Sequence, residues 1–142
     1  MKFTLILLFV VAAVANAKFE VRNKEDALKA HEECLEDNTV PDEIYEKFLN
    51  YEFPEHKRTN CYIKCFVEKM GLFTELKGFD ENAIITQFTY KNFKNLESVR
   101  HGLEKCIDHN EWESDTCTWA NRVFSCWLKI NRHVVRKIYG DA

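Results

Sequence analysis

Apolar residues recur every three or four positions along most of the chain, as they do on one face of an α-helix. We expect six helices, at about residues 23–37, 41–53, 58–70, 80–90, 95–107 and 115–131. Residues suited to an N-cap or a first turn stand at most of these starts, namely Asn23, Pro41, Asp80, Asn95 and Ser114 or Asp115. No stretch shows the apolar and polar alternation of a strand, so the sequence predicts an all-α domain.

The sequence further indicates the inner face of the first expected helix and the end of the second. The inner stripe of the first should contain Ala27, Leu28, His31, Cys34 and Leu35. The second should end before Pro54, because the residue that precedes a proline resists helical backbone. Helices this short must cross at varied angles around a shared centre.

The first 17 residues are typical of a secretory signal. A charged start at Lys2 and an apolar run at 3–14 are followed by the tripeptide Ala-Asn-Ala, which predicts cleavage after Ala17. The run is about twelve residues long, whereas a membrane-spanning helix needs about twenty. We therefore expect a secreted, extracellular protein without a membrane span, whose single domain covers residues 18–142.

This domain is mildly acidic. Without Lys2, 19 of the 20 basic residues remain against 23 acidic ones, a net charge of −4 with histidine neutral. Such a balance provides no basic footprint for nucleic acid and no polybasic segment for anionic lipid. The domain also has 9 Phe, 5 Tyr and 3 Trp but only 4 Gly and 2 Pro, which favours a compact helical domain over a loop-rich mini-protein.

All six cysteines fall in the expected domain, at Cys34, Cys61, Cys65, Cys106, Cys117 and Cys126. An even count in a secreted chain predicts disulfides, here three. A zinc site is the competing interpretation, but the close pair is spaced C-x3-C, whereas zinc sites favour C-x2-C. Two cysteines nine residues apart on one helix are about 13.5 Å apart, which excludes Cys117–Cys126, and Cys61–Cys65 is disfavoured. Several other pairings stay open.

We do not expect an enzyme. The nucleophile-elbow motif G-x-S-x-G is absent from the sequence. Asp108 and His109 are adjacent in sequence, so on a helix they would point apart rather than act together. The residue pattern also indicates no cofactor and no metal.

The cysteine spacing C-x26-C-x3-C-x40-C-x10-C-x8-C resembles that of insect odorant-binding proteins, in the six-cysteine pheromone- and general-odorant-binding family. The stretches YEFPEHKRTNCYIKCFVEKMGLF from Tyr51 and CTWANRVFSCW from Cys117 resemble dipteran members in particular. The resemblance covers the whole expected domain. Six intervals in order are much more specific than C-x3-C alone.

The resemblance implies about six short helices around an internal apolar pocket, with disulfides Cys34–Cys65, Cys61–Cys117 and Cys106–Cys126. Counted from the cysteines, the implied ligand-binding residues are Ile63, Val67, Leu72, Phe73, Phe88, Leu103, Ile107, Val123 and Trp127, with Phe66, Ile85 and Phe124 as alternates. Candidates for a ligand-binding hydroxyl are Tyr45, Tyr62 and Tyr90. Only 16 residues follow Cys126, so we expect the tail to form a wall or lid and not a buried helix.

These observations predict a secreted carrier that binds a small hydrophobic molecule, such as an odorant, pheromone or fatty acid, and transports it through aqueous fluid. The alternative is a disulfide-stapled module that binds other proteins in haemolymph or saliva. Beyond the ligand, the candidate partners are a chemoreceptor and a second copy of the chain. Nucleic acid is not an expected partner.

Overall fold

The computed structural model describes residues 18–140, so the predicted signal peptide and its cleavage site lie outside the described part. Six α-helices make up most of the described chain: α1 (Lys24–Asn38), α2 (Asp42–Phe48), α3 (Lys57–Lys69), α4 (Glu81–Thr89), α5 (Leu96–Cys106) and α6 (Thr116–Tyr139). A hairpin of two short strands, β1 (Phe73–Thr74) and β2 (Gly78–Phe79), follows α3, and a 3₁₀ turn, η2 (Phe93–Asn95), precedes α5. The all-α prediction is confirmed, with this small hairpin as the addition.

Side-chain caps fix several of the helix starts. Asn23 and Asp26 form a reciprocal capping box at α1, with both N–H···O distances at 2.9 Å. Asp80 accepts the Ala83 N–H at α4, and Asp115 accepts the Thr118 N–H at α6, each at 3.0 Å. The helix starts predicted from these residues are therefore correct. Asn95 differs, because it ends η2 and makes no side-chain cap at α5.

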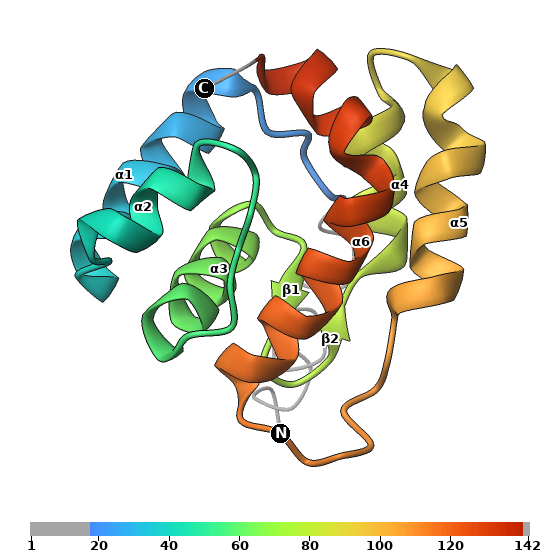
Figure 1. The fold of residues 1–142 in the computed structure, drawn as a ribbon. Coiled ribbons are helices and arrows are strands. Elements are labelled where there is room, and N and C mark those ends of the chain that lie inside the picture. The colour runs from blue at the N-terminus through green and yellow to red at the C-terminus, as the bar shows by residue number, and fades with distance from the viewer. Residues whose placement is uncertain (1–17, 141–142) are drawn as a thin grey trace, which may run out of the picture.

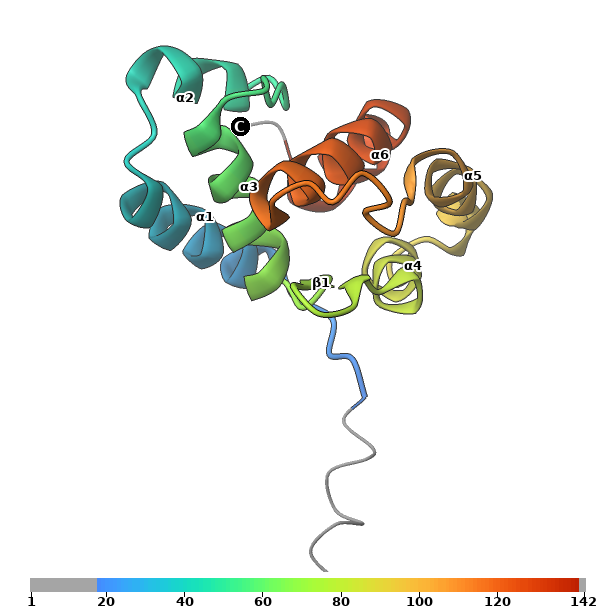
Figure 2. The ribbon, with the colours of Figure 1, turned by 90° about the horizontal axis from the view of Figure 1, so that it is seen from below.

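The helices form two groups that meet at α6. In both views α1, α2 and α3 lie on one side and α4 and α5 on the other, with α6 running between them (Figures 1 and 2). The side chains that fill the space between them are mainly aliphatic and aromatic, and every one of the six helices contributes at least one buried side chain. The side of α6 that faces α4 and α5 is the side that builds the candidate site.

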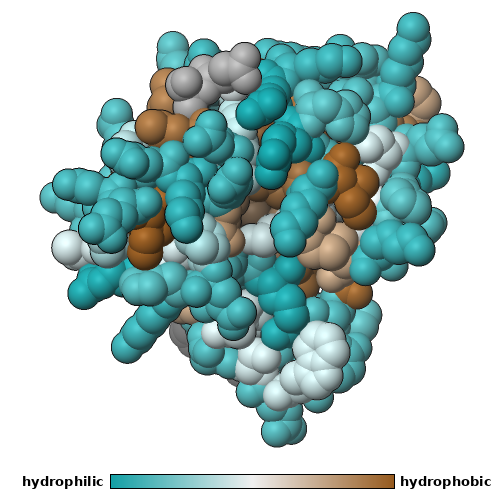
Figure 3. Space-filling view, viewed as in Figure 1, coloured by the Kyte–Doolittle hydropathy of each residue, from teal (hydrophilic) through white to brown (hydrophobic). Residues whose placement is uncertain are grey.

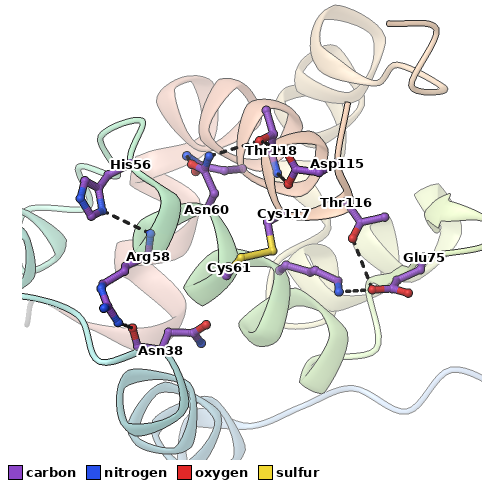
Figure 4. Close-up of a disulfide and its surroundings, with 12 residues drawn as sticks. Asn38, His56, Arg58, Asn60, Cys61, Glu75, Asp115, Thr116, Cys117 and Thr118 are labelled. Atoms are coloured by element: carbon purple, nitrogen blue, oxygen red, sulfur yellow. Dashed lines mark hydrogen bonds and ion pairs between the residues drawn. A yellow bond between two sulfur atoms is a disulfide. The ribbon is translucent and has the colours of Figure 1, made fainter. Parts of the chain in front are cut away.

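Three disulfides connect the elements, in the pairing that the family resemblance implied. Cys34–Cys65 joins α1 to α3, Cys61–Cys117 joins α3 to α6, and Cys106–Cys126 joins α5 to α6. Figure 4 shows the second of these, with hydrogen bonds from neighbouring polar residues of α3 and α6 beside it. Helices α2 and α4 contain no cysteine, so they are held by noncovalent contacts alone.

The tail differs from the expectation in one respect, because it is a helix with one buried face. Helix α6 continues to Tyr139, with one non-helical residue at Asn131 (φ −109°, ψ 17°), and Val134, Val135 and Ile138 in the tail are buried. No proline or glycine lies between residues 126 and 139 to stop the helix, and its apolar residues keep helical spacing. The kink at Asn131 turns that apolar face onto the core.

The inner face of α1 and the end of α2 also differ from the sequence-based expectations. Leu28 is 50% exposed and does not belong to the inner stripe of α1. Helix α2 ends at Phe48, well before Pro54, since Tyr51 takes a left-handed backbone (φ +57°) and donates its hydroxyl to Gly140 O at 2.7 Å. A contact with the distant C-terminal end therefore decides where the chain turns.

Candidate functional site

A small internal cavity lies between α4, α5, α6 and strand β2. Its volume is about 10 Å³, close to the space needed for one water molecule. Its lining consists of Phe79, Ile84, Leu103, Cys106, Ile107, Val123, Phe124 and Trp127. All eight side chains are apolar, and Cys106 is tied into its disulfide.

The outer end of the cavity is defined by two residues. Phe79 in β2 and Ile107 just after α5 are half-buried, whereas the other six lining residues are buried. A molecule that reaches the cavity with the least disturbance of the core would therefore pass between the hairpin and the loop at 107–115. We call this end the mouth.

Trp127 forms the inner wall and is held from several sides. Its ring centroid lies 4.6 Å from that of Phe88, and its Nε1 donates to Val99 O at 3.3 Å. Gly102 permits this position, because a Cβ there would lie 2.7 Å from Trp127 Cδ1 and 2.4 Å from the side-chain amide of Asn131. Glycine on α5 thus lets the indole lie against the helix backbone.

The kink in α6 lies next to this wall. The amide of Asn131 is fully buried and lies 2.7 Å from Ser98 Oγ on α5. This hydrogen bond between α5 and α6 fixes the point at which α6 bends. The bend places the tail segment after Asn131 against the core rather than in solvent.

The loop beside the mouth is fastened to α6 by an ion pair. Arg122 binds Asp108 through two contacts, Nε to Oδ2 at 2.9 Å and Nη2 to Oδ1 at 3.0 Å, and it also donates to Ser114 Oγ at 2.8 Å. Hydrogen bonds from Arg122 hold the pKa of Asp108 below its ordinary value. The guanidinium also lies 4.7 Å from the ring of Trp112. These contacts fix the loop that carries Ile107.

A larger depression, of about 430 Å³, is open to solvent between the end of α1 and the start of α3. Five of its six lining residues are polar or charged, and two hydrogen bonds connect them: Arg58 Nη1 donates to Asn38 O at 3.1 Å, and His56 accepts the Arg58 N–H (Figure 4). Volume alone would favour this depression. A hydrophobic molecule needs apolar walls, so the small internal cavity is the better candidate.

The sequence and fold of this chain are similar to those of known proteins. Residues 16–130 match the PBP/GOBP family. The chain is a member of the PBP/GOBP family. It is 34% identical over 132 residues to general odorant-binding protein 99a of Drosophila melanogaster, with 93% of each chain covered. It is 36% identical over 131 residues to odorant-binding protein 22 of Aedes aegypti, covering 92% of this chain and 93% of that one.

The fold of this PBP/GOBP member is also found in a solved structure. An odorant-binding protein of Locusta migratoria aligns with a TM-score of 0.64 and 16% identity, over 88% of this chain and 96% of that chain. The predicted family and its dipteran resemblance are confirmed by the two dipteran relatives. In the part of the chain that the structure describes, no helix has the length and apolar character to cross a membrane.

The nine binding residues proposed from the PBP/GOBP resemblance divide into two sets. Four line the cavity: Leu103, Ile107, Val123 and Trp127. The other five are buried but do not line it, namely Ile63, Val67, Leu72, Phe73 and Phe88. Phe88 packs behind Trp127, and Phe73 packs against Phe79 and Trp119 at 4.9 and 5.3 Å between centroids. These five lie in the layer behind the wall or elsewhere in the core.

Sequence reasoning did not select three lining residues, Phe79, Ile84 and Cys106, and it placed Phe124 only among the alternates. Ile84 stands next to Ile85 on α4, and helical spacing alone does not tell which of two adjacent isoleucines faces α5. Phe79 had one available signal, since a large apolar residue in an expected loop needs a buried place. The hairpin provides that place.

None of the three candidate tyrosines lines the cavity. Tyr62 is buried against α1, where its hydroxyl lies 2.6 Å from His31 Nδ1. Burial raises the pKa of Tyr62 and lowers that of His31, which keeps both groups neutral at pH 7. Tyr90 is exposed, and Tyr45 packs against the His31 ring at 6.0 Å between centroids. Tyr45 and Tyr62 thus belong to a structural cluster of α1, α2 and α3, whereas Tyr90 lies at the end of α4.

Proposed function

We propose that this PBP/GOBP member is a secreted carrier, which binds a small hydrophobic ligand in the cavity between α4, α5 and α6 and transports it through aqueous fluid. The observation that supports this most directly is the uniformly apolar lining of an internal cavity. Apolar surface removed from water contributes about 25 cal/mol per Å², so such a wall binds hydrophobic molecules without any polar contact. The names of the dipteran relatives support the same function.

The cavity must expand to hold a ligand. Pockets for small molecules enclose about 300–1,000 Å³, against about 10 Å³ here. We propose that expansion occurs by movement of Phe124, Ile107 and α4. Helix α4 has no disulfide, and Ile107 and Phe79 at the mouth are half-buried. The disulfide Cys106–Cys126 keeps α5 and α6 together while the space between them and α4 changes.

Fluorescence titration of the oxidised, delipidated protein with N-phenyl-1-naphthylamine tests this proposal. We expect saturable uptake at one site and displacement by hydrophobic volatiles at micromolar concentration. A matched pair of variants locates the site: Val123→Trp, which fills the cavity, should abolish uptake, whereas Leu28→Trp on the exposed face of α1 should leave it unchanged. Absence of uptake by the folded wild-type chain would contradict the carrier function.

The alternative, a protein-binding module, would require an exposed apolar surface. The large exposed apolar residues come from different parts of the chain: Leu28, Leu49, Leu76, Tyr90, Phe93 and Trp112. Hydrophilic side chains cover most of the face in Figure 3, and the hydrophobic areas on it are small. Single exposed apolar residues are ordinary on protein surfaces. The carrier is therefore the better-supported function.

A further inference from the structure

We propose that the cavity selects neutral apolar molecules and discriminates against ionised carboxylates. This inference rests on the carrier function proposed above and specifies the class of ligand. Burial of the apolar tail alone does not distinguish a fatty acid from a fatty alcohol of equal length, because the two have the same tail.

The cavity wall provides no partner for a charge. Among its eight lining residues the one side-chain N–H group belongs to Trp127, and this group already donates to Val99 O. An ionised carboxylate taken out of water without a partner loses its hydration and gains nothing in return. A hydroxyl or ester loses much less, because it carries no net charge.

Two clusters of buried polar groups elsewhere in the core already have their hydrogen-bond partners. The Gln87 amide on α4 accepts the Arg22 N–H and donates to Arg22 O and to the Tyr139 hydroxyl, each at 2.8 Å. Between α3 and α6, Asn121 donates to Asn60 at 2.7 Å and accepts from Ser125 at 2.6 Å. A carboxylate could use these donors only by breaking existing hydrogen bonds.

Within the described residues, two buried side-chain polar atoms have no hydrogen-bond partner, Thr59 Oγ1 and Arg132 Nε. Neither residue lines the cavity. The Arg132 guanidinium follows the kink, in the tail segment of α6, and Thr59 lies in the first turn of α3. Of the described residues, neither of these two buried unpartnered groups therefore offers a hydrogen bond or a charge to the cavity.

The loop at the mouth does not supply the positive charge that the interior of the cavity lacks. The segment 107–115 contains four acidic residues, Asp108, Glu111, Glu113 and Asp115, one histidine, His109, and no lysine or arginine. Arg122, which faces this segment, is bound in two contacts to Asp108. Lys77 and Lys105 stand two positions from Phe79 and Ile107, but both are exposed and hydrated, so an ion pair that either formed with a carboxylate would contribute little to binding. A carboxylate left at the mouth beside Ile107 would thus meet a loop of its own sign.

Displacement of N-phenyl-1-naphthylamine by 1-decanol and by decanoate at pH 7.4 tests the inference. We expect 1-decanol to displace the probe at a concentration at least tenfold lower than decanoate. Equal potency of the two would overturn the inference while leaving the carrier function standing. Failure of the probe itself to bind would instead contradict the carrier function, so the two failures are distinguishable.

A charge placed at the mouth provides the second readout. Ile107→Lys should lower the displacing concentration of decanoate at least fivefold relative to Ile107→Gln, which has similar length and polarity but no charge. The two variants should respond equally to 1-decanol. If Ile107→Lys and Ile107→Gln gave the same value for decanoate, the wild-type selectivity would not come from the missing cation, and the inference would be wrong.

Discussion

Substitution of Leu103 by alanine should make the protein less stable and a better binder. Leu103 is 3% exposed and lines the cavity from α5. Replacing a buried leucine by alanine costs about 2–5 kcal/mol, from lost transfer energy and from the void that remains. In a domain of this size that corresponds to a fall in Tm on the order of 10 °C.

The chain should survive this loss in a folded state. Its disulfides connect residues 31, 56 and 20 positions apart, and each is expected to contribute about 3–4 kcal/mol by restricting the unfolded chain. The void from Leu103 would join the existing cavity of about 10 Å³. Less core must then move when a ligand binds, so we expect the Kd of N-phenyl-1-naphthylamine to fall at least threefold.

Leu128→Ala is the matched control. Leu128 on α6 is 2% exposed and does not line the cavity, so the same atoms are removed from a different part of the core. Both variants should lose similar stability in thermal unfolding followed by circular dichroism. Only Leu103→Ala should gain affinity in the fluorescence titration. An equal gain in the two variants would mean that general loosening, and not the volume of this cavity, controls binding.

Three further results are expected. Gly102→Ala should lower the free energy of unfolding by about 1–3 kcal/mol, the usual cost of overpacking, because the added Cβ would overlap Trp127. Denaturant unfolding measures this change, and unchanged stability would contradict the close approach of Trp127 to Gly102. Arg122 lowers the pKa of Asp108 in the folded protein. The ion pair therefore stabilises the fold at pH values above the pKa of Asp108 in the unfolded chain, and this stabilisation is lost as the pH falls through the pKa of Asp108 in the folded protein. The Tm of Asp108→Asn should change less between pH 5 and pH 2.5 than that of the wild type, and parallel curves for the two proteins would exclude this role. Burial lowers the pKa of His31 in the folded protein, so the unfolded chain takes up the proton first and the stability of the fold falls as pH drops below about 6.5. His31→Gln should weaken this dependence of stability on pH between pH 7 and pH 5. An identical slope of Tm against pH in the variant and the wild type would refute the role of His31.

The fold was largely readable from the sequence because its signals are local. A capping residue such as Asn23, Asp80 or Asp115 acts within three positions, and a helical stripe repeats within one turn. The disulfide pairing was different. Helix geometry left several pairings open, and the correct one came from the family resemblance.

The candidate site was only partly readable, because lining a cavity depends on distant neighbours. Phe88 and Leu103 both lie on inward helix faces, yet Trp127 separates Phe88 from the cavity that Leu103 borders. The end of α2 and the course of the tail were also missed. Both depend on pairs far apart in sequence, Tyr51 with Gly140 and Ser98 with Asn131, which no local pattern reveals.

The uneven distribution of the disulfides has a consequence for amide hydrogen exchange. Helices α3 and α6 are each joined to two other helices, whereas α4 is kept in place by packing and by the hydrogen bonds of Gln87. Local opening requires the least free energy where few constraints must be broken. Amides of α4 should therefore exchange at lower opening energies than those of α3. Helix α4, which carries Ile84, would then open and close locally while the amides of α3 stay protected from exchange. A ligand would be released through this local opening without global unfolding.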